Sequence, residues 1–326
     1  MAIRTMQGAV LSRLVFLMIS SFVGAKAEAW GHVGHEQLAE VATTLTTNGH
    51  DFWTKNQKTM GVLANVPDVV WKSSDTYAME KSTHFFQPDS YADDPAQFEQ
   101  FPRDYDAATA KYSTEALAES GTATWRAKQL YDLAVTAFKN GDFQSGIEYA
   151  GTMSHYIGGL SQPLHVTKNY DGADTGDKGI HAFFETTNIQ HADLNDLIET
   201  VTSEAQVDLN DQNFRAQSKG AIIDTVFNEV SRAYSFKDMV IDNDLNLGRS
   251  GKGAKVQLAL AETRMADGAA TLSMILSKMW SDAGNPNGSD VQLNPRPGWV
   301  KPDYSLRQST LTRSKLSLAI DDDCDL

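Results

Sequence analysis

The chain has 326 residues, of which 41% are hydrophobic and 21% are charged, and its formal net charge is −14 at pH 7. This length and composition are typical of one large or two modest globular domains that bury a sizeable core. The acidic balance excludes a non-specific grip on nucleic acid through a basic face, whereas phosphate chemistry through bound metal ions remains open because the ions bring their own positive charge.

The N-terminus has the pattern of a secretory signal peptide. Arg4 and Arg13 precede an uncharged apolar run, residues 14–25, which is followed by the small-x-small pattern Ala27–Ala29. The run is too short to span a bilayer. We therefore expect cleavage at the end of this pattern, which makes Trp30 the first residue of a secreted or periplasmic protein that is not transmembrane. The alternative is a signal anchor that is never removed.

The rest of the chain divides into one domain and a tail. Residues 30–283 contain the periodic apolar patterns, whereas residues 284–326 are rich in Asn, Gly, Pro, Ser and Asp and are predicted to form an extended or disordered tail. The single cysteine, Cys324, lies in this tail, so no internal disulfide is possible. Stability must come from the core or from bound metal. The oligomeric state is not predicted.

Helical spacing of apolar residues predicts an all-α fold, a single compact multi-helix domain. We expect two or three helices with polar loops within residues 192–247, and a long surface loop over residues 87–113. The other helices are expected at about residues 33–45, 113–139, 143–158, from 180 onward, and 252–280. No internal repeat and no sustained alternating strand pattern occurs in the sequence.

Histidine is concentrated between Ser154 and Glu185. His155 and His165 lie on either side of Pro163, and His181 precedes Glu185 by four residues, so a helix would place the last two on one face. Imidazoles and a carboxylate are the ligands that hold zinc in proteins.

Four further residues could join such a site, and each has a structural alternative. Asp68 lies in an apolar segment after Pro67, so it is either a helix cap or a metal ligand. His84 follows Thr83 among aromatic residues and is either a core histidine or a ligand. Trp30 could be a buried anchor, or its α-amine could chelate a metal together with His35.

The order of these groups resembles that of the zinc-dependent phospholipases C and the related zinc-dependent single-strand nucleases. The most specific match is HYIGGLSQPLH, residues 155–165. The resemblance covers nearly all of the chain from Trp30 to the last helix, and it implies an all-helical fold around a zinc cluster. It further implies the metal ligands of three zinc ions: Trp30 and His35 for one, Asp68, His84 and His155 for the second, and His165, His181 and Glu185 for the third.

The chain departs from the family pattern at one position. The family resembles H-x-x-G-D with an aspartate that bridges two zinc ions, whereas this chain has Gly159 four residues after His155. No acidic residue lies between His155 and His165 to replace it. We therefore expect two or three zinc ions, with the ion near Trp30 weakly held or absent unless another acid, such as Asp177, takes the place of the aspartate.

The resemblance implies a secreted phosphodiesterase. Glu185 and the segment 177–179 favour a phospholipase C that hydrolyses the glycerol-phosphate ester of phospholipids such as phosphatidylcholine by a zinc-activated water, oriented by Asp68 as the catalytic residue. The partner is then phospholipid at a membrane surface, with no stable nucleic-acid partner. The five-residue step from Trp30 to His35 is closer to the nucleases, so a zinc-dependent single-strand nuclease or nucleotidase remains an alternative. Gly159 leaves open a non-catalytic zinc-binding relative.

Overall fold

The structure is a computed structural model, and it describes residues 30–72, 76–91, 98, 100–288, 291, 304 and 306. These residues form helices and turns and no strand, which confirms the predicted all-α class. The predicted signal peptide, most of the predicted tail and Cys324 lie outside the described residues. No described helix is both long enough and apolar enough to cross a membrane.

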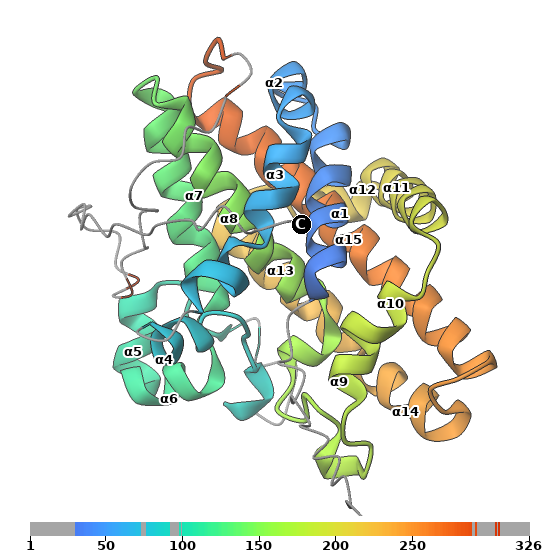
Figure 1. The fold of residues 1–326 in the computed structure, drawn as a ribbon. Helices are drawn as coiled ribbons and strands as arrows, with labels where there is room; N and C mark the ends of the chain where they lie inside the picture. Colours follow the sequence, from blue (N-terminus) through green and yellow to red (C-terminus); the bar gives the residue numbers. More distant parts are fainter. Residues whose placement is uncertain are drawn as a thin grey trace, which may run out of the picture.

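Long and short helices alternate along the described chain, and the longest is α15 near its end (Figure 1). The first third contains α1 (Gly31–Leu45), α2 (His50–Lys55), α3 (Gln57–Ala64), the π-helix η1 (Pro67–Trp71), α4 (Tyr77–Lys81), η2 (Pro88–Ser90), α5 (Tyr105–Tyr112) and α6 (Thr114–Ser120). The middle contains α7 (Ala123–Lys139), α8 (Phe143–Ser161), η4 (Pro163–Val166), η5 (Ala173–Thr175), α9 (Ile180–Ala182), the π-helix η6 (Phe183–Thr187) and α10 (Asn188–Gln190). The last part contains α11 (Leu194–Asn210), α12 (Gln212–Ala216), α13 (Ile222–Ser235), α14 (Lys237–Leu247) and α15 (Lys252–Asp282).

Helix α8 is the central element of the domain. It packs against α1, α3, α7, α13 and α15, and nearly all of its side chains are buried (Figure 1). Two glycines allow this close packing. A Cβ on Gly146 would lie 2.5 Å from the ring of Phe138, and one on Gly151 would lie 2.4 Å from the side chain of Leu63. The backbone of α8 can therefore approach α7 and α3 more closely than any other residue would permit.

A buried ion pair joins α15 to α13 and to the end of α8. Arg264 and Glu229 are both fully buried, with Nη2 2.8 Å from Oε1, and Arg264 Nε donates to the carbonyl oxygen of Ser161. Asp267 and Arg232 complete the cluster. Burial lowers the pKa of Arg264 to about 10, a shift that Glu229 opposes, so the guanidinium stays charged at neutral pH. The cluster fixes where α8 ends and the next segment begins.

Three sequence predictions about the positions or number of helices are wrong. The segment expected as a loop over residues 87–113 contains α5, because Asp104 caps that helix by accepting from Ala107 N. The helix expected over residues 113–139 is divided into α6 and α7 at Gly121, whose φ of +94° suits glycine. The segment expected to hold two or three helices over residues 192–247 holds four.

Replacement of Glu229 by Gln should destabilise the fold strongly. The Glu229→Gln change leaves the buried charge of Arg264 with less compensation, so we expect the free energy of unfolding to fall by about 3 kcal/mol in urea denaturation. The control is Lys278→Gln, which breaks an exposed ion pair with Asp282 on the same helix α15 and should cost about 1 kcal/mol or less. A loss of the same size for both variants would contradict this account.

Candidate metal centre

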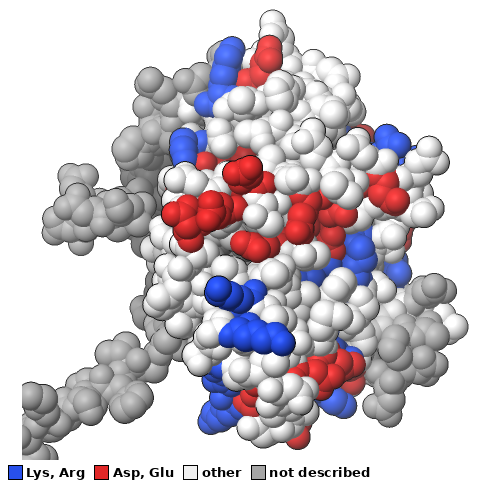
Figure 2. Space-filling view, turned by 90° about the vertical axis from the view of Figure 1, so that its right-hand side faces the viewer, with Lys and Arg blue, Asp and Glu red and all other residues white. Residues whose placement is uncertain are grey.

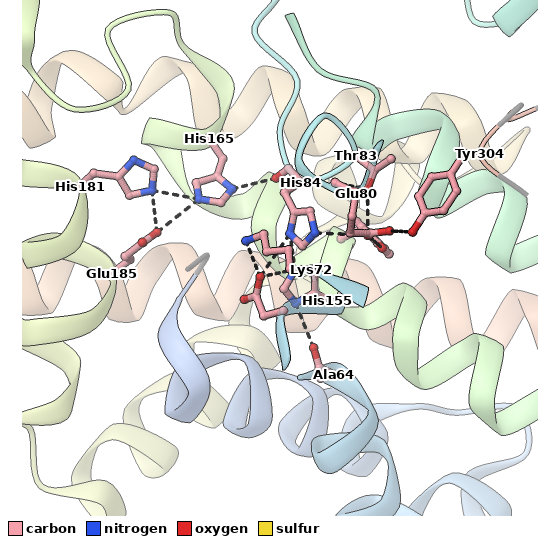
Figure 3. Close-up of polar contacts among 12 residues, drawn as sticks. Ala64, Lys72, Glu80, Thr83, His84, His155, His165, His181, Glu185 and Tyr304 are labelled. Carbon is pink, nitrogen blue, oxygen red and sulfur yellow. Dashed lines mark hydrogen bonds and ion pairs between the residues drawn. The ribbon is translucent and has the colours of Figure 1, made fainter. Parts of the chain in front are cut away.

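The seven predicted ligands with imidazole or carboxylate groups are brought together from seven different elements or segments of the fold. They form two adjacent groups at the C-terminal half of α8 (Figure 3). All of these side chains are buried. The residues are His35 on α1, Asp68 on η1, His84 after α4, His155 on α8, His165 on η4, and His181 and Glu185 on α9 and η6.

The His165 group consists of His165, His181 and Glu185. Glu185 Oε2 lies 2.8 Å from His181 Nε2 and 3.2 Å from His165 Nε2, and the two Nε2 atoms are 3.0 Å apart. The one-turn spacing of His181 and Glu185 aims both side chains at His165, as the sequence predicts. Gln162 holds the carboxylate in place, because its Nε2 donates to Oε2 at 3.0 Å.

The nitrogen atoms of the His165 group fit a cation. His165 Nδ1 is 2.9 Å from the carbonyl oxygen of His84, which only accepts, so Nδ1 carries the proton. Burial lowers the pKa of His165, so the ring is neutral and Nε2 presents a lone pair to His181 and Glu185. These three atoms are an imidazole–imidazole–carboxylate set of the kind that binds zinc.

A proton takes the place of the cation in the metal-free chain. Burial would lower the pKa of His181, but the charge of Glu185 and its hydrogen bond raise it. Burial in turn raises the pKa of Glu185, and this is outweighed by His181 and His165, which lower it to about 2. Positive charge is therefore favoured at the point between the three side chains.

The His155 group consists of His35, Asp68, His84 and His155. His84 Nδ1 lies 2.9 Å from His155 Nε2 and 3.4 Å from Asp68 Oδ1. The ring of His35 stacks on that of His155, with centroids 4.0 Å apart. His35, Asp68 and His155 each offer one ligand atom within 4.8 Å of the other two.

The nitrogens of the His155 group also fit a cation. His155 Nδ1 bonds to the carbonyl oxygen of Ala64 at 2.9 Å, so its Nε2 faces the group with a lone pair. Burial lowers the pKa of His155 and of His35 well below the usual value, so both rings are neutral. Neither ring nitrogen of His35 has a hydrogen-bond partner among the described residues, although His35 is 1% exposed. Orphaned buried nitrogens are costly unless a ligand binds them.

Trp30 and Gly159 contribute no side-chain ligand atom to either group. The indole of Trp30 is buried, and its Nε1 donates to the carbonyl oxygen of Gly158 at 2.7 Å and to Ser161 Oγ at 3.1 Å. The predicted role of its α-amine depends on cleavage before it and stays a prediction. Gly159 lies within α8, and no described carboxylate from α8 reaches the His155 group.

Asp177, which the sequence offered as a replacement acid, lies elsewhere. Its Oδ1 is 3.4 Å from Arg249 Nη2, and Arg249 also bonds to Asp244 at 2.7 Å. These contacts hold the loop before α9 against the connection between α14 and α15. Asp177 is in neither ligand group.

Two charged residues at the site were missed by sequence reasoning. Lys72 Nζ lies 2.5 Å from Asp68 Oδ1, and Glu80 Oε1 lies 3.2 Å from His84 Nε2. Each is four residues from the ligand that it contacts. That spacing was the available signal, because it places side chains on one face of a helix.

Both groups open into one cavity of about 440 Å³. Asp68 and His84 line it from one group, and His165 and His181 from the other. A small molecule in this cavity could therefore reach metal ions held by either group.

The sequence matches no protein-family model, and no curated protein is significantly similar to it. Several solved structures resemble the fold, among them two clostridial toxins. The alpha toxin from Clostridium absonum is 14% identical, with a TM-score of 0.44 over 78% of this chain and 65% of the toxin. The alpha-toxin of a Clostridium perfringens avian strain is 16% identical, with a TM-score of 0.47 over 81% of this chain and 67% of the toxin. The chain thus spans about two thirds of these proteins, and the likeness is one of fold alone.

The Asp177 loop should give a pH-dependent stability. Burial, and then the nearby Asp244, raise the pKa of Asp177 to about 6, above the ordinary value of about 4. The folded chain therefore binds this proton more tightly than the unfolded chain, and ionisation of Asp177 destabilises the fold as the pH rises. For Asp177→Asn, the stability gain over the wild type should increase between about pH 4 and about pH 6 and stay constant above that.

The measurement is urea unfolding of the metal-free chain across this pH range. Asp174→Asn, an exposed residue on the same loop, is the matched control and should show no such trend. A stability gain for Asp177→Asn that is the same at every pH would rule out a raised pKa at this position.

Proposed function

We propose that this chain is a secreted zinc-dependent phosphodiesterase that acts as a phospholipase C on phospholipids such as phosphatidylcholine. The observation that carries the proposal is the cavity into which both ligand groups open, with Lys72 beside Asp68 at its wall. His165, His181 and Glu185 would hold one zinc ion. Asp68, His84 and His155 would hold a second, and Trp30 and His35 a third when it is present.

The side chains around the cavity have separate roles in this proposal. A bound zinc ion supplies positive charge that activates water and stabilises phosphate oxygens. Asp68 would orient the attacking water. Burial raises the pKa of Asp68, but His84 and Lys72 outweigh this effect and lower it, so the group is a carboxylate at neutral pH. The ammonium of Lys72 would face the phosphate oxygens, where a fixed positive charge favours the transition state.

The other walls of the cavity favour a phospholipid head group. Phe85, Leu164 and Tyr77 give the cavity an apolar side, and the exposed carboxylate of Glu119 lies at its edge. Aromatic rings beside a carboxylate suit a quaternary ammonium group. One face of the molecule carries a band of Asp and Glu (Figure 2), which disfavours a long polyanion such as nucleic acid.

A single-strand nuclease or nucleotidase is the second candidate. Tyr77 and Tyr170 line the cavity and are 42% and 52% exposed, so a nucleobase could stack on either ring. A non-catalytic zinc protein is the third, because Gly159 leaves the His155 group without a carboxylate from α8.

The deciding experiment uses the purified chain with a verified Trp30 N-terminus. We expect release of phosphocholine from phosphatidylcholine vesicles, loss of this activity with a chelator, and recovery with Zn²⁺. Faster cleavage of single-stranded DNA than of lipid would select the nuclease. Bound zinc with no hydrolysis of either substrate would select the non-catalytic protein.

Lys72 should matter for turnover more than for folding. The Lys72→Met change removes the charge that faces the phosphate, so we expect kcat/KM on phosphatidylcholine to fall about 100-fold. Lys72→Arg should recover part of the loss. Lys58→Met, which breaks an ion pair with Glu40 away from the cavity, is the control and should leave kcat/KM unchanged. Equal effects of the two methionine variants would contradict the role of Lys72.

A further inference from the structure

Glu80 is a fully buried carboxylate on the far side of His84 from the other ligands (Figure 3). The hydroxyl of Tyr156 donates to its Oε1, and Thr83 Oγ1 lies 2.9 Å from the same atom. The hydroxyl of Tyr304 donates to Oε2. These donors hold Glu80 in one orientation, with Oε1 toward His84.

The contact with His84 selects one form of the imidazole. His84 Nε2 lies 3.2 Å from Glu80 Oε1, an ion-pair distance, and it makes no hydrogen bond among the described residues. A carboxylate cannot donate a hydrogen, so this contact favours the form of His84 in which Nε2 carries the proton. The other nitrogen, Nδ1, is then left with its lone pair.

That lone pair is aimed at the His155 group. Nδ1 of His84 is 2.9 Å from His155 Nε2, which also presents a lone pair because His155 Nδ1–H donates to the carbonyl oxygen of Ala64. Two lone pairs at this distance repel each other unless a cation lies beside them. The orientation that Glu80 imposes is therefore unfavourable in the absence of a cation and suited to binding one.

We infer that Glu80 is the positioning residue of the His155 metal site, which fixes the tautomer and ring orientation of His84 so that Nδ1 binds the ion. Ligating histidines in proteins commonly donate their second ring N–H to a carboxylate, and this contact increases the affinity for metal. The inference rests on the metal sites of the proposed function, but not on the substrate or on turnover.

A purely structural role for Glu80 makes a different prediction. If Glu80 only stabilised the core, its replacement would weaken both metal groups together through loss of packing. If it positions His84, its replacement weakens one group and spares the other. The His165 group is thus an internal control within the same molecule.

The test is competition of the full mature chain with a chromophoric chelator for Zn²⁺. We expect Glu80→Gln to weaken one zinc-binding step by about 10- to 100-fold and to leave the step of the His165 group unchanged. Tyr304→Phe removes one donor to Glu80 without touching His84, so it should weaken that step about fivefold at most. His165→Ala should remove the other step and so identify which is which.

Equal weakening of both steps, or no weakening of either, by Glu80→Gln would overturn the inference. Zinc binding without any phosphodiesterase activity would refute the proposed function and leave the role of Glu80 standing. A wild-type chain that binds no zinc would refute both.

The wild-type chain provides a test that does not depend on a variant that folds. In the ¹¹³Cd-loaded protein with ¹⁵N-labelled histidine, we expect His84 to couple to the metal through Nδ1 and to keep a proton on Nε2. Coupling through Nε2, or none at all, would overturn the inference.

Discussion

Buried nitrogen lone pairs that face one another are the constraint around which this fold is built. His84 Nδ1 lies 2.9 Å from His155 Nε2, and His165 Nε2 lies 3.0 Å from His181 Nε2. The rings of His155 and His165 are each held by a hydrogen bond from Nδ1 to a backbone carbonyl oxygen. A hydrophobic core alone does not require such contacts, because burying two imidazoles costs desolvation that a shared proton or a cation must offset. They become favourable when a cation lies between the rings, so the surrounding helices hold a binding geometry and not only a core.

Two long-range contacts at the end of α8 hold the histidines of α8 and η4 in this arrangement. The indole of Trp30 donates to the carbonyl oxygen of Gly158, and Arg264 donates to that of Ser161, so the last turn of α8 is held from α1 and from α15. The chain then turns at Pro163, and the carbonyl oxygen of His84 accepts a hydrogen bond from His165 Nδ1. That single bond joins the two ligand groups, which explains why residues from the first and middle parts of the chain form one centre.

Part of the candidate ligand set could be grouped from the sequence, because the spacing within that part is local. His181 and Glu185 lie one turn apart, and the segment 155–165 matches a known family pattern. Glu80 and Lys72 have the same four-residue spacing from His84 and Asp68, but charged residues at that spacing usually lie on solvated surfaces. Tyr156 and Tyr304 help to hold Glu80 inward, and neither of these contacts has a local signature. The boundaries at α5 and α6 depend instead on local features, the Asp104 cap and Gly121, that helical periodicity does not reveal.

Glu80 compensates in part for the missing carboxylate at Gly159. A divalent ion held by Asp68, His84 and His155 would meet a single carboxylate, Asp68, part of whose charge is taken by Lys72. An acid at position 159 would have added a second negative charge directly. Glu80 places a negative charge behind His84 instead. Burial raises the pKa of Glu80, but His84 and the nearby Arg126 outweigh this effect and lower it to about 2. A carboxylate that contacts the second nitrogen of a ligating imidazole increases the affinity of the imidazole for metal, and the carboxylate itself does not coordinate the ion. Asp68 and His84 also line the cavity, so an ion held by Asp68, His84 and His155 would face it, and three protein ligands would leave room for water as in catalytic zinc sites.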